Sequence, residues 1–362
     1  MKSNQLFSKN QFGFLEGRST TLQLLTVLEN WTKAIDQGHC IDTLYMDYQK
    51  AFDKVPHKRL ISKLKSYNII PQLVQWINSF LSKRSHQVCI NDKASTMTEV
   101  VSGVPQGSVL GPVLFVIYIN DLPNLVDSDV YLFADDTKIF KHIKDNQDEK
   151  NLQEDLDIVA NWCDTWLLKL HPDKCKHMRL GKQKNQGVYT ILGNVLQTVN
   201  DEKDIGVITD DSLSFEKHIC EKVKKSTQMF AMLRRSFQFL DANMFVPLYK
   251  TLVRTHLDYA SPAWAPFKVK HTDMLESVQR RATKQIKGMK NLTYEQRLKE
   301  LKLPSLHYRR LRGDMIEVYK ILNDKYDPEV SSRILMLHQD IVDRGVRGHS
   351  KKLFLRRANT EL

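Results

Sequence analysis

The chain has 362 residues, which is too long for one ordinary hydrophobic core and predicts two or three lobes. Hydrophobic residues make up 41% and charged residues 27%, a balance typical of a globular protein. The longest apolar run, 113–119, is far shorter than the roughly 20 residues of a membrane span, and no signal-peptide segment is apparent. We therefore expect a cytoplasmic or nuclear protein that does not enter membranes.

The five cysteines are scattered and form no C-x-x-C pair, which predicts reduced thiols and excludes a disulfide framework. The formal net charge is +12, and it is concentrated near the C-terminus. Between Lys268 and Arg312 there are 13 Lys and Arg against 4 Asp and Glu. Basic residues that neutralise phosphates release counterions, so this segment is a candidate for nucleic-acid binding, with a solvated helix face as the alternative. The candidate contacts are Lys268, Lys270, Arg280, Arg281, Lys284 and Lys287.

Several elements are predicted from periodicity in the first part of the chain. Apolar residues recur every three or four positions over 22–35, which predicts an amphipathic helix. The segment CIDTLYMDY, 40–48, alternates and predicts a strand that buries one face and ends at Asp47. The segments 57–69 and 71–82 are predicted helices. Residues 86–103 predict a hairpin that turns at Asn91-Asp92.

The turn GVPQGSVLGP precedes an apolar helix that is predicted to reach Leu122, and DVYLFADDTKIF, 129–140, is predicted to form a second hairpin. A helix follows over 148–170, then short strands over 174–181 and 189–211. From Phe215 onward the pattern is almost entirely helical. The sequence thus predicts a mixed α+β first half and an all-helical, basic second half.

Three segments carry residues that are suited to chemistry. LYMDYQKAFDKVPH contains Asp47 and, five residues later, Phe52; GVPQGSVLGPVLF contains Gln106; and YLFADDTKIF contains Asp135 and Asp136. Each segment alone is weak evidence for a catalytic site. Paired aspartates in a hairpin turn are more often structural than catalytic, because aspartate hydrogen-bonds the turn backbone and tolerates its dihedral angles.

In this order and at these spacings, the segments resemble motifs A, B and C of the reverse transcriptases, and in particular those of non-LTR (LINE-type) retrotransposons. KAFDKV, PQGSVLGPVLF and FADD each resemble the usual wording of that family. QFGFLEGRST resembles its fingers motif, and the segment 253–288 resembles the post-polymerase region of the jockey and chicken-repeat clades. The resemblance covers essentially the whole chain.

The resemblance implies a right-hand polymerase of the α+β class. Its parts would be a fingers remnant (1–36), a palm with an antiparallel sheet backed by helices (37–208), a helical thumb (209–265) and a basic helical C-terminal region (266–362). Family members carry several hundred further residues before the fingers motif, so we expect a chain truncated at its N-terminus, without an endonuclease domain, and truncated at its C-terminus.

The implied activity is RNA-directed DNA synthesis, in which dNTPs are added to the 3′-hydroxyl of a primer on an RNA template. The primer would be DNA, or a nicked target DNA. In-line phosphoryl transfer needs positioning and charge stabilisation, which two Mg²⁺ ions, or Mn²⁺ in their place, supply. Mg²⁺ prefers hard oxygen ligands. By resemblance, the metal ligands and catalytic carboxylates are Asp47, Asp135 and Asp136.

Further roles are implied for residues near the nucleotide. An aromatic residue at the position of Phe52 packs under the sugar and excludes a ribose 2′-hydroxyl. Lys174 resembles the lysine of motif D, which sits near the pyrophosphate, although this chain reads HPDK where the family usually reads Asn-x-x-Lys, with His171 in the asparagine position. The implied substrate contacts are Arg18, Tyr48, Phe52, Gln106 and Gly107.

Two other interpretations remain open at this point. Asp53 lies six residues after Asp47, as in viral RNA-dependent RNA polymerases, although Phe52 favours DNA synthesis. The second interpretation is an inactive remnant of a polymerase that only binds nucleic acid. A zinc site formed by Cys163, His171, Cys175 and His177 is disfavoured, because their spacing matches no zinc pattern.

Overall fold

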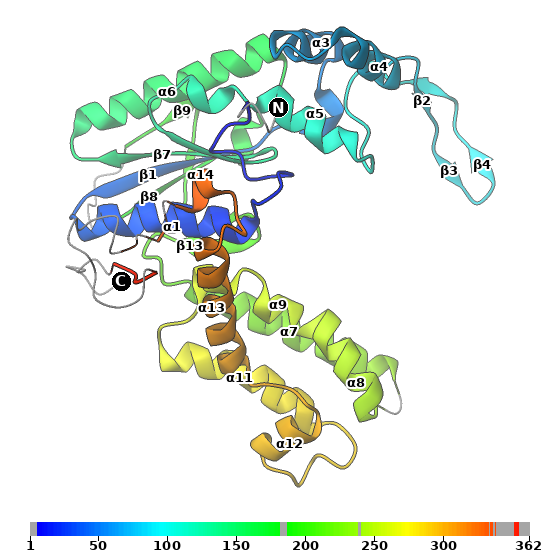
Figure 1. Ribbon diagram of the computed structural model, residues 1–362, viewed down its shortest axis with the longest axis vertical. Coiled ribbons are helices and arrows are strands. Elements are labelled where there is room, and N and C mark those ends of the chain that lie inside the picture. The colour runs from blue at the N-terminus through cyan, green and yellow to red at the C-terminus, as the bar shows by residue number, and fades with distance from the viewer. Residues whose placement is uncertain are drawn as a thin grey trace. The chain divides into compact units, whose positions relative to one another are not determined.

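The computed structural model describes residues 6–181, 187–237, 240–332, 334–335, 337 and 351–354. The chain divides into two compact units (Figure 1). The first contains Met1–Gln23 and Trp31–Asn200, and the second contains Leu24–Asn30 and Asp201–Leu362. The predicted division into four parts at residues 36, 208 and 265 is finer than this one and stays a prediction.

A five-stranded sheet forms the centre of the first unit, in the order β11-β8-β1-β7-β6. All its neighbouring strands are antiparallel except β11 and β8, which are parallel. The strands are β1 (Cys40–Met46), β6 (Asp129–Phe133), β7 (Asp136–Ile143), β8 (Lys176–Leu180) and β11 (Gln197–Thr198). With its covering helices, this sheet confirms the predicted α+β class.

The central strand β1 is buried at all seven residues, so the prediction that it buries only one face is wrong. It lies between β7 and β8, and α1 and α6 lie on opposite faces of the sheet (Figure 1). Leu44 and Met46 belong to the same core cluster as the apolar residues of α5 and α6. On the other face, Trp31 of α1 contacts Phe140 of β7 edge to face, with ring centroids 5.8 Å apart. A strand that is covered on both faces need not alternate between apolar and polar residues.

The helices that periodicity predicted before residue 171 are present, with boundaries shifted by a few residues, whereas the four-residue helix Ala51–Lys54 was not predicted. Helix α5 is apolar on all sides and almost entirely buried, as expected for a helix inside a core. The helices are α1 (Thr20–Asp36), α2 (Ala51–Lys54), α3 (His57–Ser66), α4 (Pro71–Leu81), α5 (Leu110–Ile119) and α6 (Asn146–Trp166), with 3-10 turns at Leu122–Asn124 and Pro172–Lys174.

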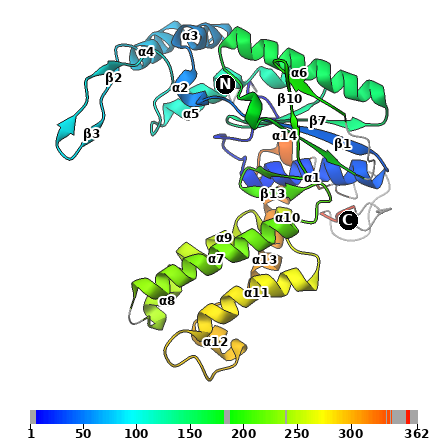
Figure 2. The same ribbon diagram turned by 180° about the vertical axis from the view of Figure 1, so that it is seen from behind.

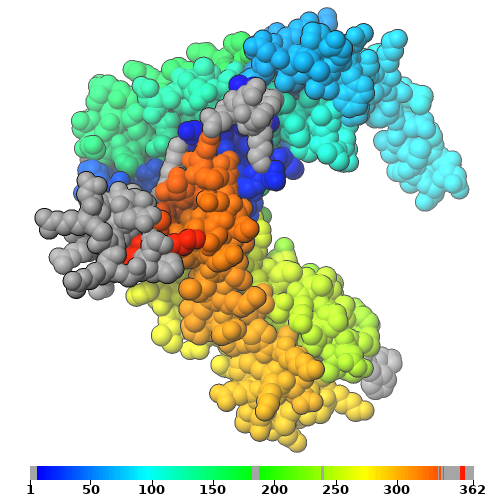
Figure 3. Space-filling view, in the orientation of Figure 1, coloured from blue at the N-terminus to red at the C-terminus, as the bar shows by residue number. Residues whose placement is uncertain are grey.

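A long hairpin stands out from the first unit, as the space-filling view shows in cyan (Figure 3). Strand β2 (Ser85–His86) pairs with β5 (Thr98–Glu99), and β3 (Cys89–Ile90) pairs with β4 (Lys93–Ala94). All four strands are exposed. Asn91 and Asp92 at its tip have φ values of 44° and 65°. Two consecutive positive φ values are typical of a type I′ turn, so the predicted turn position is confirmed.

The second unit is helical after one hairpin, which confirms the pattern predicted from Phe215 onward. Its core cluster includes Phe245, Tyr249 and Trp264. The elements are β12 (Asp201–Asp204), β13 (Val207–Asp210), α7 (Glu216–Ser236), α8 (Ala242–Leu248), a π-helical turn (Tyr249–Val253), α9 (Thr255–Asp258), α10 (Ser261–Trp264), α11 (Val269–Lys284), α12 (Tyr294–Glu300), α13 (Leu306–Leu322) and α14 (Pro328–Ser331). Throughout the described ranges, every helix is too short or too polar to cross a bilayer. The short strands β9 (Thr190–Ile191) and β10 (Asn194–Val195) pair in the first unit.

Candidate active site

Two of the predicted catalytic aspartates lie at the same edge of the central sheet. The last residue pair between β1 and β7 is Met46 with Thr137. Asp47 follows Met46 along the chain, and Asp136 precedes Thr137, so the two aspartates occupy facing positions one step beyond this pair. Asp135 is next to Asp136, in the two-residue turn between β6 and β7. The register of the sheet therefore brings the three predicted carboxylates to one place.

The turn that carries Asp135 is held by the segment of the predicted fingers motif. Ala134, the other turn residue, has a φ of 57°, a left-handed conformation that is strained for alanine. Its backbone N–H donates a 3.0 Å hydrogen bond to Oε1 of Gln11, which also accepts from the backbone of Gly13. A Cβ atom on Gly13 would lie 2.4 Å from the nitrogen of Ala134. This close packing fixes the hairpin tip in a conformation that alanine rarely adopts alone.

The three carboxylates repel one another electrostatically. Burial raises the pKa of Asp135 above its ordinary value, and the negative charge of Asp47 raises it further. Burial also raises the pKa of Asp136, with added repulsion from Asp135 and Asp47, while the ammonium of Lys138 opposes the shift. A cluster of this kind is stabilised by any cation that enters it.

Asp47 already has one cationic neighbour. The Nζ atom of Lys174 lies 3.4 Å from Oδ2 of Asp47, although both side chains are partly exposed, at 62% and 44%. Lys174 ends the 3-10 turn Pro172–Lys174, which directly precedes the strand β8. The structure therefore brings the lysine of the predicted motif D against the aspartate of the predicted motif A.

Two residues that the sequence did not single out as supports, His171 and Cys175, hold the backbone of Asp47. The backbone N–H of His171 donates a 2.8 Å hydrogen bond to the Asp47 carbonyl oxygen. The backbone N–H of Asp47 in turn donates to Sγ of Cys175 over 3.5 Å. Both contacts fix where the strand β1 ends. No signal in the sequence pointed to these roles, since the partners are more than 120 residues apart in the chain.

The aspartates offer a partial fit to Mg²⁺. Across the part of the chain that the structure describes, no group of three or more His, Cys, Asp or Glu side chains is arranged to hold a metal ion, which also gives no support for zinc. Mg²⁺ is commonly bound by only one or two carboxylates together with substrate phosphates and water. Oδ2 of Asp47 is buried without a hydrogen-bond donor, and the ammonium of Lys174 lies 3.4 Å from it. These residues therefore suit a metal that binds together with a nucleotide.

Phe52 lies on an aromatic stack beside this edge. Its ring stacks on Phe115 of α5 with centroids 4.4 Å apart, and Phe14 contacts it edge to face at 6.3 Å. Phe52 is only partly buried, and Phe14 is 56% exposed. The ring thus has a fixed orientation and retains an accessible surface.

The segment of the predicted motif B is joined to the segment that follows Asp47. The backbone N–H groups of Gly103 and Val104 donate 2.8 Å hydrogen bonds to the carbonyl oxygens of Val55 and Phe52. A Cβ atom on Gly103 would lie 2.8 Å from Cα of Asp53, so only glycine allows this approach. The backbone of Phe52 is therefore held by the Gly-rich loop.

Gln106 and Gly107 lie at the exposed part of this loop. The Gln106 side-chain amide donates a 3.0 Å hydrogen bond to Oδ1 of Asp53. Gly107 has a φ of +83°, and a Cβ atom there would meet nothing within 4 Å. Asp53 is thus engaged with the motif B loop, and the space beside Gly107 is open.

Comparison with known proteins decides the family. Residues 1–232 match the family described as reverse transcriptase (RNA-dependent DNA polymerase), which is more than half of the chain. The chain belongs to the reverse transcriptase family. Among its relatives, the RNA-directed DNA polymerase from mobile element jockey of Drosophila funebris is 30% identical over 342 residues, which cover 90% of this chain and 36% of the relative.

Other relatives of this reverse transcriptase are similar. The jockey polymerase of Drosophila melanogaster is 27% identical over 82% of this chain and 34% of its own length. A probable RNA-directed DNA polymerase from transposon BS of the same species is 30% identical over 65% of this chain and 27% of its own length. The chain therefore spans about a third of the length of the relatives it matches. Among solved structures, telomerase from Candida tropicalis, in complex with a TWJ fragment of telomeric RNA, is 9% identical with a TM-score of 0.40, and the match covers 83% of this chain and 54% of the telomerase chain.

Two predicted substrate contacts of the reverse transcriptase lie in structural positions. Nη1 of Arg18 donates 2.6 Å hydrogen bonds to the carbonyl oxygens of Ser8 and Gln11. Tyr48 is only 6% exposed and belongs to the core cluster. Burial of the Tyr48 ring disfavours its predicted contact with substrate, and the contacts of Arg18 indicate that it braces the loop that supports Ala134.

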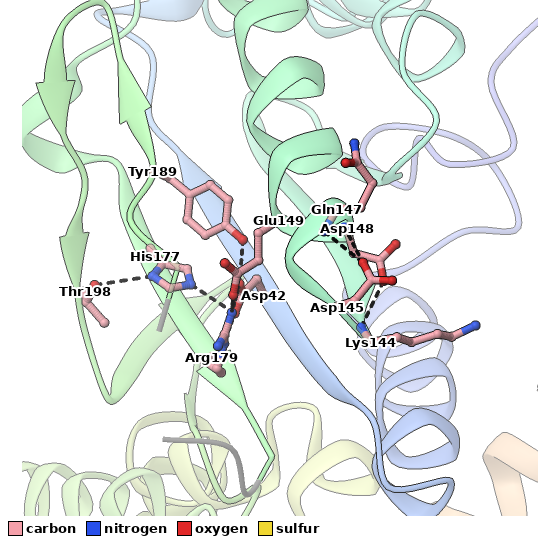
Figure 4. A network of polar contacts seen from close by, with 10 residues as sticks. All are labelled: Asp42, Lys144, Asp145, Gln147, Asp148, Glu149, His177, Arg179, Tyr189 and Thr198. Carbon is pink, nitrogen blue, oxygen red and sulfur yellow. Dashed lines mark hydrogen bonds and ion pairs between the residues drawn. The ribbon is translucent and has the colours of Figure 1, made fainter. Parts of the chain in front are cut away.

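A network of charged and polar residues links β1, β8 and α6 (Figure 4). Asp42 of β1 faces Arg179 of β8 in the strand register, and Nε of Arg179 donates a 2.6 Å hydrogen bond to Oδ1 of Asp42. Tyr189 and His177 also contact this carboxylate, and Glu149 of α6 contacts Arg179. Burial alone would raise the pKa of Asp42, but hydrogen bonds from Arg179 and His177 hold it below its ordinary value. The network joins β1, which ends just before Asp47, to β8, which begins two residues after Lys174.

The six predicted nucleic-acid contacts of the reverse transcriptase are all exposed in the second unit. Four of them lie on α11: Lys270, Arg280, Arg281 and Lys284. Lys270 lies 3.6 Å from Glu216, and the guanidinium of Arg280 lies over the ring of Tyr294 at 5.3 Å. Lys268 precedes the helix and Lys287 follows it. The predicted set thus occupies one helix and its two ends.

Proposed function

We propose that this chain is the polymerase part of a non-LTR retrotransposon protein and that it carries out RNA-directed DNA synthesis. The observation that carries the proposal is the position of Asp47 and Asp136 at facing ends of β1 and β7, with Asp135 beside them, in a chain of the reverse transcriptase family. The same residues at separate places in the fold would not support a catalytic role.

The proposed reaction adds a dNTP to the 3′-hydroxyl of a primer and releases pyrophosphate. In this reaction the protein mainly supplies position and charge stabilisation. Asp47, Asp135 and Asp136 would hold Mg²⁺, or Mn²⁺ in its place, which when bound lowers the pKa of the primer hydroxyl and neutralises phosphate charge. The backbone contacts of Asp47 with His171 and Cys175 keep its carboxylate at the sheet edge.

The residues around the carboxylates suit the remaining tasks. Lys174, whose ammonium lies 3.4 Å from Asp47, is proposed to donate a proton to the departing pyrophosphate. Phe52, fixed by its stack on Phe115, is proposed to pack under the deoxyribose and to exclude a 2′-hydroxyl. Gln106 and Gly107 are proposed to border the nucleotide, because the loop is open at Gly107.

The proposed macromolecular partners are an RNA template and a DNA primer or target DNA. The exposed basic residues of α11 and its flanks support this, since charge neutralisation of phosphates supplies most of the sequence-independent affinity for nucleic acid. In this proposal residues 37–208 form the palm, and the helical segments after residue 208 form the thumb and the basic C-terminal region.

Primer extension on a primed RNA template tests the proposed function. Wild type and Asp135→Asn are incubated with Mg²⁺ and either dNTPs or NTPs. Extension with dNTPs only, lost in Asp135→Asn while RNA binding is retained, is the expected result. Salt-sensitive RNA binding without any extension would instead favour a remnant that only binds nucleic acid, and extension with NTPs would favour an RNA polymerase.

A further inference from the structure

A groove lies between the C-terminal halves of α7 and α11 in the second unit. The two helices run side by side (Figure 2). They run in the same direction, because Glu216 and Lys270 near their N-terminal ends lie 3.6 Å apart, and Arg234 bonds Gln285 at their C-terminal ends over 3.4 Å. The groove has a volume of about 520 Å³, within the range of roughly 300–1,000 Å³ of small-ligand pockets.

The lining of this groove combines cationic and apolar side chains. Arg234 and Arg235 come from α7 and Arg281 comes from α11, while Phe230 and Val278 supply apolar surface. The residues that line it include no aspartate and no glutamate. Charges of one sign that line a groove concentrate anions near it, and the apolar side chains favour a ligand that also offers apolar surface.

The three arginines have no carboxylate partner among the residues that the structure describes. Arg234 bonds the neutral amide of Gln285, and Arg281 bonds the backbone oxygen and hydroxyl of Ser277 over 3.3 and 3.4 Å. Arg235 is exposed and has no described ion pair. Elsewhere in this unit arginine does pair, as Arg309 does with Asp258 at 2.7 Å. Three uncompensated guanidinium groups around one groove therefore favour an anionic ligand with several charges.

The apolar surface indicates what kind of anion fits. Guanidinium groups bind phosphates in bidentate geometry, and base faces stack on aromatic side chains. A duplex keeps its base faces inside the stack and offers mainly phosphates to a surface, so it would leave Phe230 and Val278 uncovered. A single strand offers phosphates and unstacked bases together, and it would cover both kinds of surface.

We propose that the groove between α7 and α11 binds a single-stranded stretch of nucleic acid, with phosphates on Arg234, Arg235 and Arg281 and a base against Phe230. The inference rests on the proposed function, because it names the form in which part of the template or primer is held. Arg281 belongs to the basic segment that the sequence singled out, but Arg234 and Arg235 lie outside it and join it only in the fold.

Fluorescence anisotropy with a labelled short RNA tests this site, with the same RNA annealed to complementary DNA as the duplex probe. The double variant Arg234→Gln/Arg281→Gln should lower the slope of log affinity against log salt for the single strand by about 1.4, or about 0.7 for each lost phosphate contact. Phe230→Leu keeps apolar packing against Phe245 but removes the aromatic face, and should weaken single-strand binding by roughly 5- to 150-fold. Lys225→Gln, at an exposed lysine of α7 that does not line the groove, is the control and should leave the slope unchanged.

The outcomes separate this proposal from the function on which it rests. An unchanged slope in the double variant, or an equal loss in Lys225→Gln, would overturn the proposed groove site. A loss that is equal for the duplex would also overturn it, in favour of a duplex-binding surface. Asp135→Asn should abolish extension and keep the wild-type salt slope. Wild-type protein that fails to extend primers, but whose slope still depends on Arg234 and Arg281, would remove the polymerase proposal and leave the groove standing.

Discussion

The ammonium nitrogen of Lys174 lies 3.4 Å from Oδ2 of Asp47, across 127 residues of sequence. The contact joins the end of β1 to the 3-10 turn before β8, and the buried pair of Asp42 and Arg179 holds these two strands in register. Lys174 therefore lies beside the proposed metal ligands without being one itself. This placement suits a group that acts on the phosphates of the substrate.

Lys174→Met is expected to slow nucleotide incorporation by about 100- to 10,000-fold, the usual effect of removing a general acid. Affinity for primed template should change little, because a single exposed lysine contributes one phosphate contact at most. Single-turnover extension and anisotropy separate the two effects. Lys169→Met, at a nearby exposed lysine, is the control and should retain the wild-type rate. Equal rates for the two variants would remove the proposed role of Lys174.

Asp135→Asn is expected to stabilise the protein in EDTA. Burial and the charge of Asp47 raise the pKa of Asp135, so its ionised form costs folding free energy above that pKa. Removing the charge should raise the free energy of unfolding at neutral pH by roughly 0.2–1 kcal/mol, the size of a partly exposed charge interaction. The difference from wild type should shrink as the pH falls through the raised pKa of the folded state, and should vanish below 3.8, where the carboxyl is protonated in both states.

In Mg²⁺ the wild type should instead be more stable than Asp135→Asn, because a ligand that binds only the folded state stabilises it. Thermal unfolding with EDTA or Mg²⁺ measures both effects. Asp164→Asn, at an exposed position of α6, is the control and should respond to neither condition. A wild-type protein whose melting temperature is unaffected by Mg²⁺, with and without dNTP, would argue against a metal site at these aspartates.

Phe52→Val is expected to raise the use of NTPs relative to dNTPs by roughly tenfold or more, because the smaller side chain leaves space for a 2′-hydroxyl. The measurement is the ratio of kcat/KM for the two nucleotides. Phe52 also stacks on Phe115, so the variant should lose roughly 1–3 kcal/mol of stability, and a thermal melt checks that it folds. Phe52→Tyr keeps the ring and should keep the wild-type ratio. An unchanged ratio in Phe52→Val would mean that another residue contacts the sugar.

Lys63 provides a pH-dependent test of the packing in the first unit. Its ammonium is buried over the ring of Trp166 at 3.8 Å and bonds Oδ1 of Asp121 at 2.6 Å. Burial lowers the pKa of Lys63 to about 8, although Asp121 opposes the shift. The folded state therefore releases this proton at lower pH than the unfolded state, so stability rises as the pH rises from 8 to 10.5, and the gain is absent below pH 8.

Urea unfolding at several pH values should show this gain in wild type relative to Lys63→Met, up to about 3 kcal/mol for the full shift. Subtracting the two curves removes the titration of tyrosines that both proteins share. Lys65→Met, at an exposed position of the same helix, should follow the wild-type curve. Parallel curves for wild type and Lys63→Met would show that Lys63 titrates normally in the folded protein.

Features that depend on neighbouring residues were predictable from the sequence. Asn91-Asp92 forms the predicted turn because both residues tolerate positive φ, and this preference acts within a few residues. The amphipathic helices also followed from periodicity, with α1 and α6 near their expected positions. The prediction for β1 failed, because its central place between β7 and β8 and its two layers of helices are properties of the sheet and not of the strand.

In the candidate site, too, the sequence revealed some residues and missed others. The order of motifs identified Asp47, Asp135, Asp136 and Lys174, and the family match supports the chemistry that the motifs imply. The groups that hold these residues in place were missed. Gln11 supports the turn at Ala134, and Cys175 accepts a hydrogen bond from the backbone of Asp47, but neither residue belongs to a pattern that signals such a contact.

The sequence by itself determined the family, through the order of its motifs, and it singled out the candidate acidic residues. It also predicted most of the local elements, because a helix or a turn depends on residues close together in the chain. The tertiary structure alone decided that Asp42 meets Arg179 and that Arg234 lies across a groove from Arg281. Contacts between distant segments depend on strand order and helix packing, which the burial of apolar surface selects over the whole chain at once.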